Sequence, residues 1–85
     1  MTYLITYDLF TPGKNYEPLI SAIKQYDSWA KLGYSCWAVR SDLTAIQIRD
    51  KLTPLLDSND RLFVCAFTAW AAFRFSEDVI HWLNK

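Results

Sequence analysis

The sequence predicts an α+β protein, in which four strands alternate with two amphipathic helices in one domain. Runs of β-branched and aromatic residues occur four times, and two segments between them carry apolar residues at helical spacing. A chain of 85 residues has room for a single hydrophobic core. We therefore expect one domain over residues 1–85, with its core at residues 2–68 and a C-terminal tail at residues 69–85.

The first half of the chain predicts a strand, a helix and a pair of extended segments. Residues 2–9 are rich in β-branched and aromatic side chains and are followed by the turn sequence Thr11-Pro12-Gly13. Residues 15–26 carry apolar side chains at helical spacing, and Pro18 lies in the first turn, where its missing N–H costs nothing. Residues 29–32 and 34–41 are two extended segments joined at Gly33.

The second helix has the clearest start signal. Thr44 and Gln47 match a capping box, and Leu43 with Ile48 matches the accompanying hydrophobic staple. Pro54 marks the end of this helix, and residues 57–60 are typical of a turn.

A last strand and a short helix complete the predicted elements. In residues 61–68 six apolar side chains follow Arg61 without a break. Ser76 is placed to cap a short helix that ends at Leu83, with two acidic residues in its first turn. The order is β-α-β-β-α-β plus a helical tail, the ferredoxin-like split βαβ pattern, with strand order 4-1-3-2 and both helices on one face.

One face of this sheet needs a cover. The first strand presents Leu4, Thr6 and Asp8 on the face opposite Tyr3, Ile5 and Tyr7, and the last strand is apolar on both faces. A sheet face that meets water should alternate with polar residues. Either the tail folds back over this face or a second copy stacks on it, and we expect a homodimer to which the tail contributes.

Composition and charge limit the classes of function. The chain has nine basic and nine acidic residues, whereas nucleic-acid-binding proteins usually carry a clustered basic excess. Strong electrostatic binding of nucleic acid is not predicted, but a weak or local site remains open. Cys36 and Cys65 are expected as plain buried thiols, and zinc is not expected because neither cysteine has a histidine nearby in sequence and no CxxC motif is present. No apolar run reaches membrane length, so we expect a cytoplasmic protein with no membrane partner.

The candidate chemistry centres on Asp8, a carboxylate at the end of an apolar strand and beside a Pro-Gly loop. The expected topology brings Ser35, Asp60 and Arg61 to the same end of the sheet, and Arg40 and Asp42 to the opposite end. Lys14 and the helix start beside it are candidates for phosphate contact, although the spacing of a nucleotide-binding P-loop is missing. Simple turn contacts and a surface ion pair explain the same residues.

The strand ending in Tyr7-Asp8, the element order and the late strand after Asn59-Asp60 resemble the small CRISPR-associated Cas-two proteins and the virulence-associated protein D family. The likeness covers residues 2 to about 68. It implies a ferredoxin-like dimer in which Asp8 lies at the interface and binds a divalent metal for phosphodiester cleavage. The loop at residues 10–16 and the strand at 34–39 depart from the family pattern. In that strand only Ser35 matches the family.

Two functions follow as hypotheses. The first is a Cas-two-like, metal-dependent endoribonuclease or toxin-type nuclease acting on RNA or DNA, with Asp8 as the catalytic residue and as the ligand of a Mg²⁺ ion shared across the dimer. Lys14, Ser35 and Arg61 are its candidate substrate-binding residues. The alternative is a catalytically inactive dimeric module from a phage, mobile element or toxin–antitoxin system that binds another protein. The Tyr7-Asp8 strand end favours the nuclease, and the neutral charge favours the module.

Overall fold

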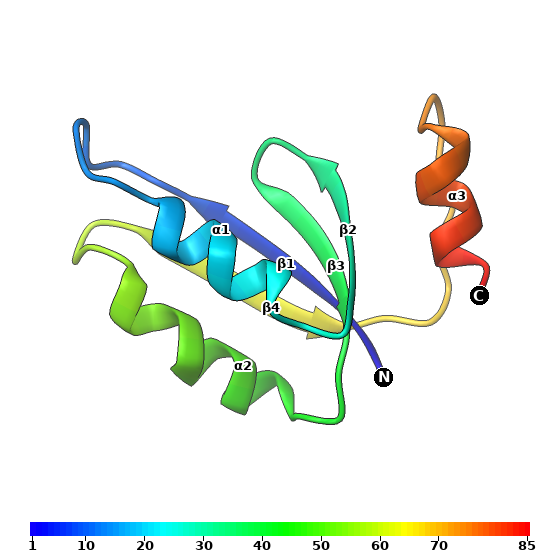
Figure 1. Cartoon of the computed structure of the whole chain (residues 1–85), viewed down its shortest axis with the longest axis horizontal. Coiled ribbons are helices and arrows are strands. Elements are labelled where there is room, and N and C mark those ends of the chain that lie inside the picture. The colour runs from blue at the N-terminus through cyan, green and yellow to red at the C-terminus, as the bar shows by residue number, and fades with distance from the viewer.

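The computed structural model covers residues 1–85 and contains one antiparallel sheet, with α1 and α2 on one face and α3 beside the sheet (Figure 1). The strands lie in the order β2-β3-β1-β4, and every neighbouring pair is antiparallel. The predicted α+β class is confirmed. In chain order the elements are β1 (Thr2–Asp8), α1 (Glu17–Lys24), β2 (Ser28–Gly33), β3 (Cys36–Arg40), α2 (Ala45–Leu52), a 3₁₀ turn (Thr53–Leu55), β4 (Arg61–Ala66) and α3 (Glu77–Leu83).

Several elements are shorter than the sequence predicts, for local reasons. The predicted helix at residues 15–26 begins at Glu17, because Asn15 accepts a hydrogen bond from the Glu17 N–H through its side chain at 3.0 Å. In the hairpin Gly33 pairs directly with Cys36, so residues 34 and 35 form the turn and are not part of β3. Gly13 has φ of +81°, as the second central residue of a Pro-Gly turn requires.

The predicted helix caps are confirmed. Thr44 Oγ1 accepts from the Gln47 N–H at 3.1 Å, and Gln47 Oε1 accepts from the Thr44 N–H at 2.8 Å, which completes the capping box of α2. Ser76 Oγ accepts from the Val79 N–H at 3.3 Å and caps α3. The longest helices have eight residues, and none is long and apolar enough to cross a membrane.

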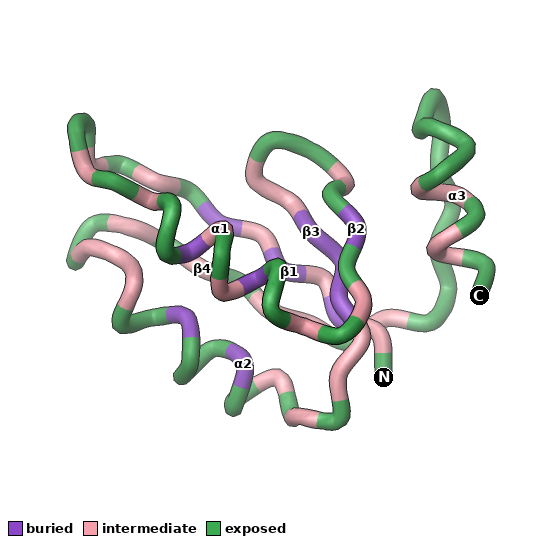
Figure 2. The backbone as a smooth tube through the Cα atoms, viewed as in Figure 1, coloured by how far each residue is buried: buried purple, intermediate pink, exposed green.

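The hydrophobic core lies between the sheet and the helices α1 and α2 (Figure 2). The alternation of β1 turns Tyr3, Ile5 and Tyr7 toward these helices, as the sequence predicts. Trp37 donates from Nε1 to Tyr7 Oη at 3.0 Å, and Tyr3 donates from its hydroxyl to the Leu43 carbonyl at 2.6 Å. These two hydrogen bonds satisfy the polar atoms of the core aromatic side chains. The nine core residues are Tyr3, Ile5, Tyr7, Leu19, Ile23, Trp37, Val39, Ile48 and Leu52.

The tail packs against the opposite face at its β2 side. The Arg40 guanidinium lies 3.8 Å from the centroid of the Trp82 ring and donates to the Trp82 carbonyl at 2.6 Å, and Trp82 Nε1 donates to Ser28 Oγ at 2.8 Å. A cavity of about 220 Å³ remains between tail and sheet. Its lining is entirely apolar and consists of Leu4, Leu32, Phe67, Ala69, Trp70, Ala71, Ala72, Phe75 and Leu83.

The tail leaves the other half of this face uncovered. Thr6 lies in register between Cys36 on β3 and Phe63 on β4, and 61% of Phe63 is exposed. Asp8, at the end of the same row of side chains, is exposed as well. We call this half, made of Thr6, Asp8, Cys36, Phe63 and Cys65, the uncovered patch.

Candidate functional site

Asp8 and Arg61 meet at the end of the sheet where β1 stops. The register of the two strands places them side by side, and Arg61 Nη2 lies 3.2 Å from Asp8 Oδ2. Both side chains are open to water, with 60% of Asp8 and 73% of Arg61 exposed. An exposed ion pair of this kind contributes only about 0–1 kcal/mol, so another cation can replace Arg61 at Asp8 at little cost.

A shallow hollow of about 270 Å³ surrounds this pair. The Arg61 guanidinium also lies 5.5 Å from the centroid of the Phe10 ring, which keeps Arg61 over the loop that follows β1. The hollow contains one carboxylate and one guanidinium group. Its lining residues are Thr6, Tyr7, Asp8, Arg61, Leu62 and Phe63.

Ser35 lies at the same end of the sheet as Asp8. Its backbone carbonyl accepts from the Tyr7 N–H at 3.1 Å, which holds the β2–β3 turn against the end of β1. The predicted gathering of Asp8, Ser35 and Arg61 at one sheet end agrees with these contacts. The contact of Ser35 is made by its backbone and positions the turn.

Lys14 belongs to a neighbouring group and forms no ion pair with Asp8 or any other carboxylate. Its Nζ lies 5.7 Å from the centroid of the Tyr16 ring. The positive charge of Lys14 helps to lower the pKa of Asp57 and Asp60. Lys14 is thus the one predicted substrate-binding residue that the structure keeps apart from the Asp8–Arg61 pair.

Asp60 ties the loop after β1 to the loop before β4. It accepts from the Phe10 N–H at 2.7 Å, from the Asp57 N–H at 2.8 Å and from the Tyr16 hydroxyl at 2.6 Å. Partial burial acts to raise the pKa of Asp60, but these hydrogen bonds outweigh it and keep the pKa below its usual value. Asp60 therefore positions the loops beside Asp8.

Asp57 completes this network. The Thr11 hydroxyl donates to Asp57 Oδ2 at 2.6 Å and lowers the pKa of that carboxyl group. Thr11 and Asp57 are 46 positions apart in sequence, and Tyr16 and Asp60 are 44 positions apart. The composition of residues 57–60 predicts a turn, but it does not identify Thr11 and Tyr16 as hydrogen-bond partners. The sequence therefore did not predict this hydrogen-bond network.

The two cysteines lie on the uncovered patch as free, half-buried thiols. Burial raises the pKa of Cys36, and the nearby Cys65 adds to this effect. Because β1 runs between β3 and β4, their strands are about 10 Å apart, beyond the reach of a disulfide within one chain.

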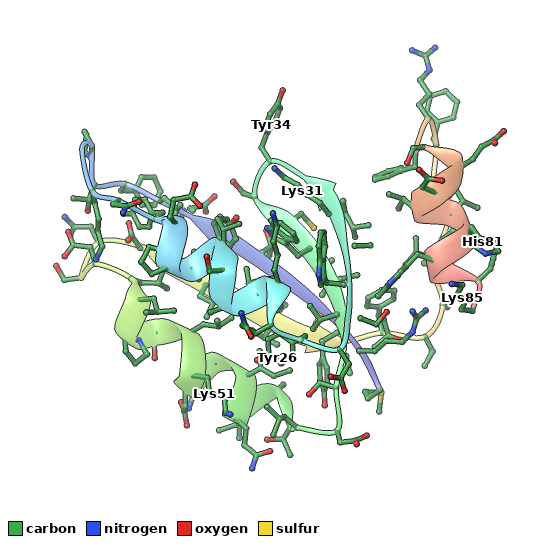
Figure 3. All side chains as sticks on the ribbon, in the orientation of Figure 1. Tyr26, Lys31, Tyr34, Lys51, His81 and Lys85 are labelled. Carbon is green, nitrogen blue, oxygen red and sulfur yellow. The ribbon has the colours of Figure 1, made fainter.

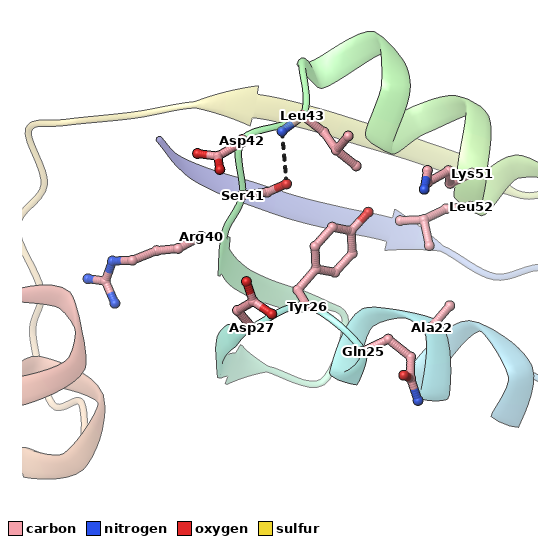
Figure 4. A pocket seen from close by; sticks show the side chains of 10 residues that line it. All are labelled: Ala22, Gln25, Tyr26, Asp27, Arg40, Ser41, Asp42, Leu43, Lys51 and Leu52. Carbon is pink, nitrogen blue, oxygen red and sulfur yellow. Dashed lines mark hydrogen bonds between the residues drawn. The ribbon is translucent and has the colours of Figure 1, made fainter.

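A second hollow, of about 460 Å³, lies at the opposite end of the sheet (Figure 4). Arg40 and Asp42 are found here, as the predicted topology requires, with Tyr26, Asp27 and Lys51. Burial raises the pKa of Tyr26. Figure 4 shows Arg40 extending away from Tyr26 toward α3, so the positive and negative groups of this hollow do not converge on one point.

Comparisons of this chain with protein-family models, curated proteins and solved structures give no match. No group of three or more His, Cys, Asp and Glu side chains is placed to hold a metal ion within one chain. The carboxylate on the uncovered patch is that of Asp8, a hard oxygen donor of the kind that Mg²⁺ prefers.

Proposed function

We propose that this chain is a Cas-two-like protein with a ferredoxin-like fold, and that it works as a homodimer joined through the uncovered patch. The observation that carries this proposal is the 61% exposure of Phe63 on a sheet face that the tail covers only in part. Apolar surface of this kind is stabilised by burial against a partner. A twofold axis through the patch lets each copy bury the same residues against the other. The strand order, which is 4-1-3-2 from the β4 edge, and two helices on one face support the fold.

The chemistry we propose for this dimer is cleavage of a phosphodiester bond in RNA or DNA. Asp8 lies in the uncovered patch, so the twofold axis brings the Asp8 side chains of both copies toward one interface. Each Asp8 donates carboxylate oxygen atoms, and two such groups with water ligands fit the needs of Mg²⁺, which keeps several waters in protein sites. When bound, Mg²⁺ supplies positive charge at the phosphate and acidifies water.

Arg61 has a second role in this scheme. Its ion pair with Asp8 is exposed and weak, so Arg61 is free to turn from Asp8 to a phosphate oxygen of the substrate. In the cleavage step a water oxygen forms a bond to phosphorus and gives up a proton, the bond from phosphorus to the leaving ester oxygen breaks, and the proton passes through solvent to that oxygen. The Asp57–Asp60 network holds the adjacent loops in place while this happens.

Cleavage of labelled single-stranded RNA and DNA, with Mg²⁺ or with EDTA, tests this chemistry in wild type and in Asp8→Asn. Asp50→Asn is a matched control, because 61% of Asp50 is exposed and Asp50 also pairs with an arginine, at 2.9 Å. We expect Mg²⁺-dependent cleavage by the wild type and by Asp50→Asn, and none by Asp8→Asn. Equal cleavage by all three proteins would assign the activity to a contaminant and refute the proposal.

The second candidate is a catalytically inactive dimer that binds another protein, for example as part of a phage or toxin–antitoxin system. The balanced charge of nine basic and nine acidic residues favours it, because nuclease substrates are polyanions. Both candidates share the dimer and differ at Asp8. A wild-type dimer that neither cleaves nucleic acid nor gains thermal stability from Mg²⁺ would support the inactive module.

A further inference from the structure

Two lysines and two tryptophans form a cluster at the outer edge of the sheet, away from Asp8. Lys24, the last residue of α1, places its Nζ 5.3 Å from the centroid of the Trp29 ring and 5.9 Å from that of Trp37. Lys31 places its Nζ 5.5 Å from the Trp37 ring on the same side. Trp29 and Lys31 belong to β2, which is an edge strand of the sheet.

The tryptophan pair is held firmly. Trp37 is 1% exposed, and its indole N–H is fixed by the hydrogen bond to Tyr7 Oη. Trp29 rests on it with ring centroids 5.6 Å apart and planes inclined by 60°. The favourable tilted contact leaves 39% of Trp29 exposed to solvent. Trp29 therefore presents part of its ring to solvent in a fixed orientation, and the Lys24 ammonium group that lies over this ring has to swing aside to admit a base.

The hairpin turn extends this surface. Tyr34 is 97% exposed, and Figure 3 shows it projecting from the β2–β3 turn, with Lys31 beneath it. The turn is anchored because the Ser35 carbonyl accepts from the Tyr7 N–H. A structural role explains the two lysines, whose side chains cover Trp29 and Trp37. No such packing role explains Tyr34, because its side chain is in solvent.

Neither lysine of this edge forms an ion pair, because the two ion pairs of the chain are Arg49–Asp50 and Arg61–Asp8. Although the net charge of the chain is zero, two unpaired ammonium groups therefore lie at this edge together with the exposed rings of Trp29 and Tyr34. Alternation of cationic and aromatic side chains is the pattern on which unpaired bases stack while phosphates meet the cations. We call Lys24, Trp29, Lys31 and Tyr34 the aromatic edge.

We propose that the aromatic edge binds single-stranded nucleic acid. Bases stack on Trp29 and Tyr34, and Lys24 and Lys31 contact the phosphates between them. Trp29 and Tyr34 are five positions apart along β2 and its turn, at most about 16 Å, which leaves room for linked nucleotides between the two rings. Base-paired nucleic acid offers no free base faces to these rings. This binding does not depend on cleavage at Asp8, although Tyr34 lies at the same sheet end.

Fluorescence anisotropy with a labelled oligouridine of about a dozen nucleotides tests the proposal, in EDTA so that no cleavage occurs. We expect Trp29→Ala to weaken binding about tenfold or more, and Trp29→Phe to restore part of it. Each of Lys24→Gln and Lys31→Gln should make the dependence of log K on log salt shallower by about 0.7. Asp8→Asn, which is expected not to cleave, should still bind the oligouridine, so loss of cleavage and loss of binding are told apart.

Matched controls lie elsewhere on the chain. Trp70→Ala changes a tryptophan of similar exposure, 36%, in the tail, and Lys51→Gln removes an exposed lysine from α2. Both should bind like the wild type. The proposal is overturned if Trp70→Ala weakens binding as much as Trp29→Ala, or if the wild type does not bind. It is also overturned if uridine monophosphate or polyglutamate competes as well as unlabelled oligouridine, since the site then takes a free nucleotide or any polyanion.

Discussion

Replacement of Phe63 by threonine should weaken the proposed dimer strongly. Complete burial of a phenylalanine side chain contributes about 1.5–3 kcal/mol. Since 61% of Phe63 is exposed in the single chain, its burial at the interface contributes roughly 1–2 kcal/mol per copy and roughly 2–4 kcal/mol per dimer. Loss of this burial raises the dimer Kd by about 30- to 1,000-fold. Threonine keeps the strand propensity of β4, so the fold itself should persist.

Sedimentation velocity over a range of protein concentrations measures this shift. Phe73→Thr is the matched control, because Phe73 lies in the tail, outside the uncovered patch, and is 78% exposed. The expected result is a dimer for wild type and Phe73→Thr under conditions where Phe63→Thr is monomeric. A wild type that stays monomeric at all concentrations, or equal effects of the two substitutions, would refute the role of the uncovered patch.

Three further predictions concern the elements that support the site. The lowered pKa of Asp60 means that the unfolded chain binds its proton more readily, so this contribution to stability is complete at neutral pH and is lost as pH falls below about 4. Asp60→Asn should reduce the drop in urea midpoint between neutral and acidic pH, and an unchanged drop would contradict this. Thr44→Ala removes the capping box of α2 and should lower the free energy of unfolding by about 1 kcal/mol in urea titrations, whereas no change would show that the cap is dispensable. Trp82→Phe supplies another aromatic ring to stack on Arg40 but loses the hydrogen bond to Ser28, worth about 0.5–1.5 kcal/mol, so amides of α3 should exchange hydrogen faster while those of β1 do not.

Most of the fold follows from local signals in the sequence. The capping box at Thr44 and the cap at Ser76 place the starts of α2 and α3, because both depend on residues within three positions of each other. The alternation of β1 identifies Tyr3, Ile5 and Tyr7 as core residues for a similar reason. Element ends are less well predicted. Asn15 and the Gly33–Cys36 pairing shorten α1 and β3 through contacts that apolar spacing does not report.

The candidate site also has one part that the sequence predicts and another that it does not. The antiparallel neighbours β1 and β4 bring Asp8 next to Arg61, so the expected order of strands is enough to predict their contact. Three hydrogen bonds tie Asp57 and Asp60 to residues 44 to 50 positions away, and composition cannot identify such partners. The lysines of the aromatic edge are likewise separated by the α1–β2 connection and meet only when α1 packs beside β2.

The sequence by itself determined that the sheet has apolar side chains on both faces, although a single core covers only one of them. The reason is that side-chain direction along a strand has a period of two residues. The sequence also determined that Asp8 lies on the face that the core does not cover. Only the tertiary structure decided how that face is divided. Arg40 and Ser28 hold Trp82 of the tail over the β2 side, so Phe63 and Asp8 remain in water. This division depends on hydrogen bonds between the tail and residues more than 40 positions away, and local sequence patterns do not predict such bonds.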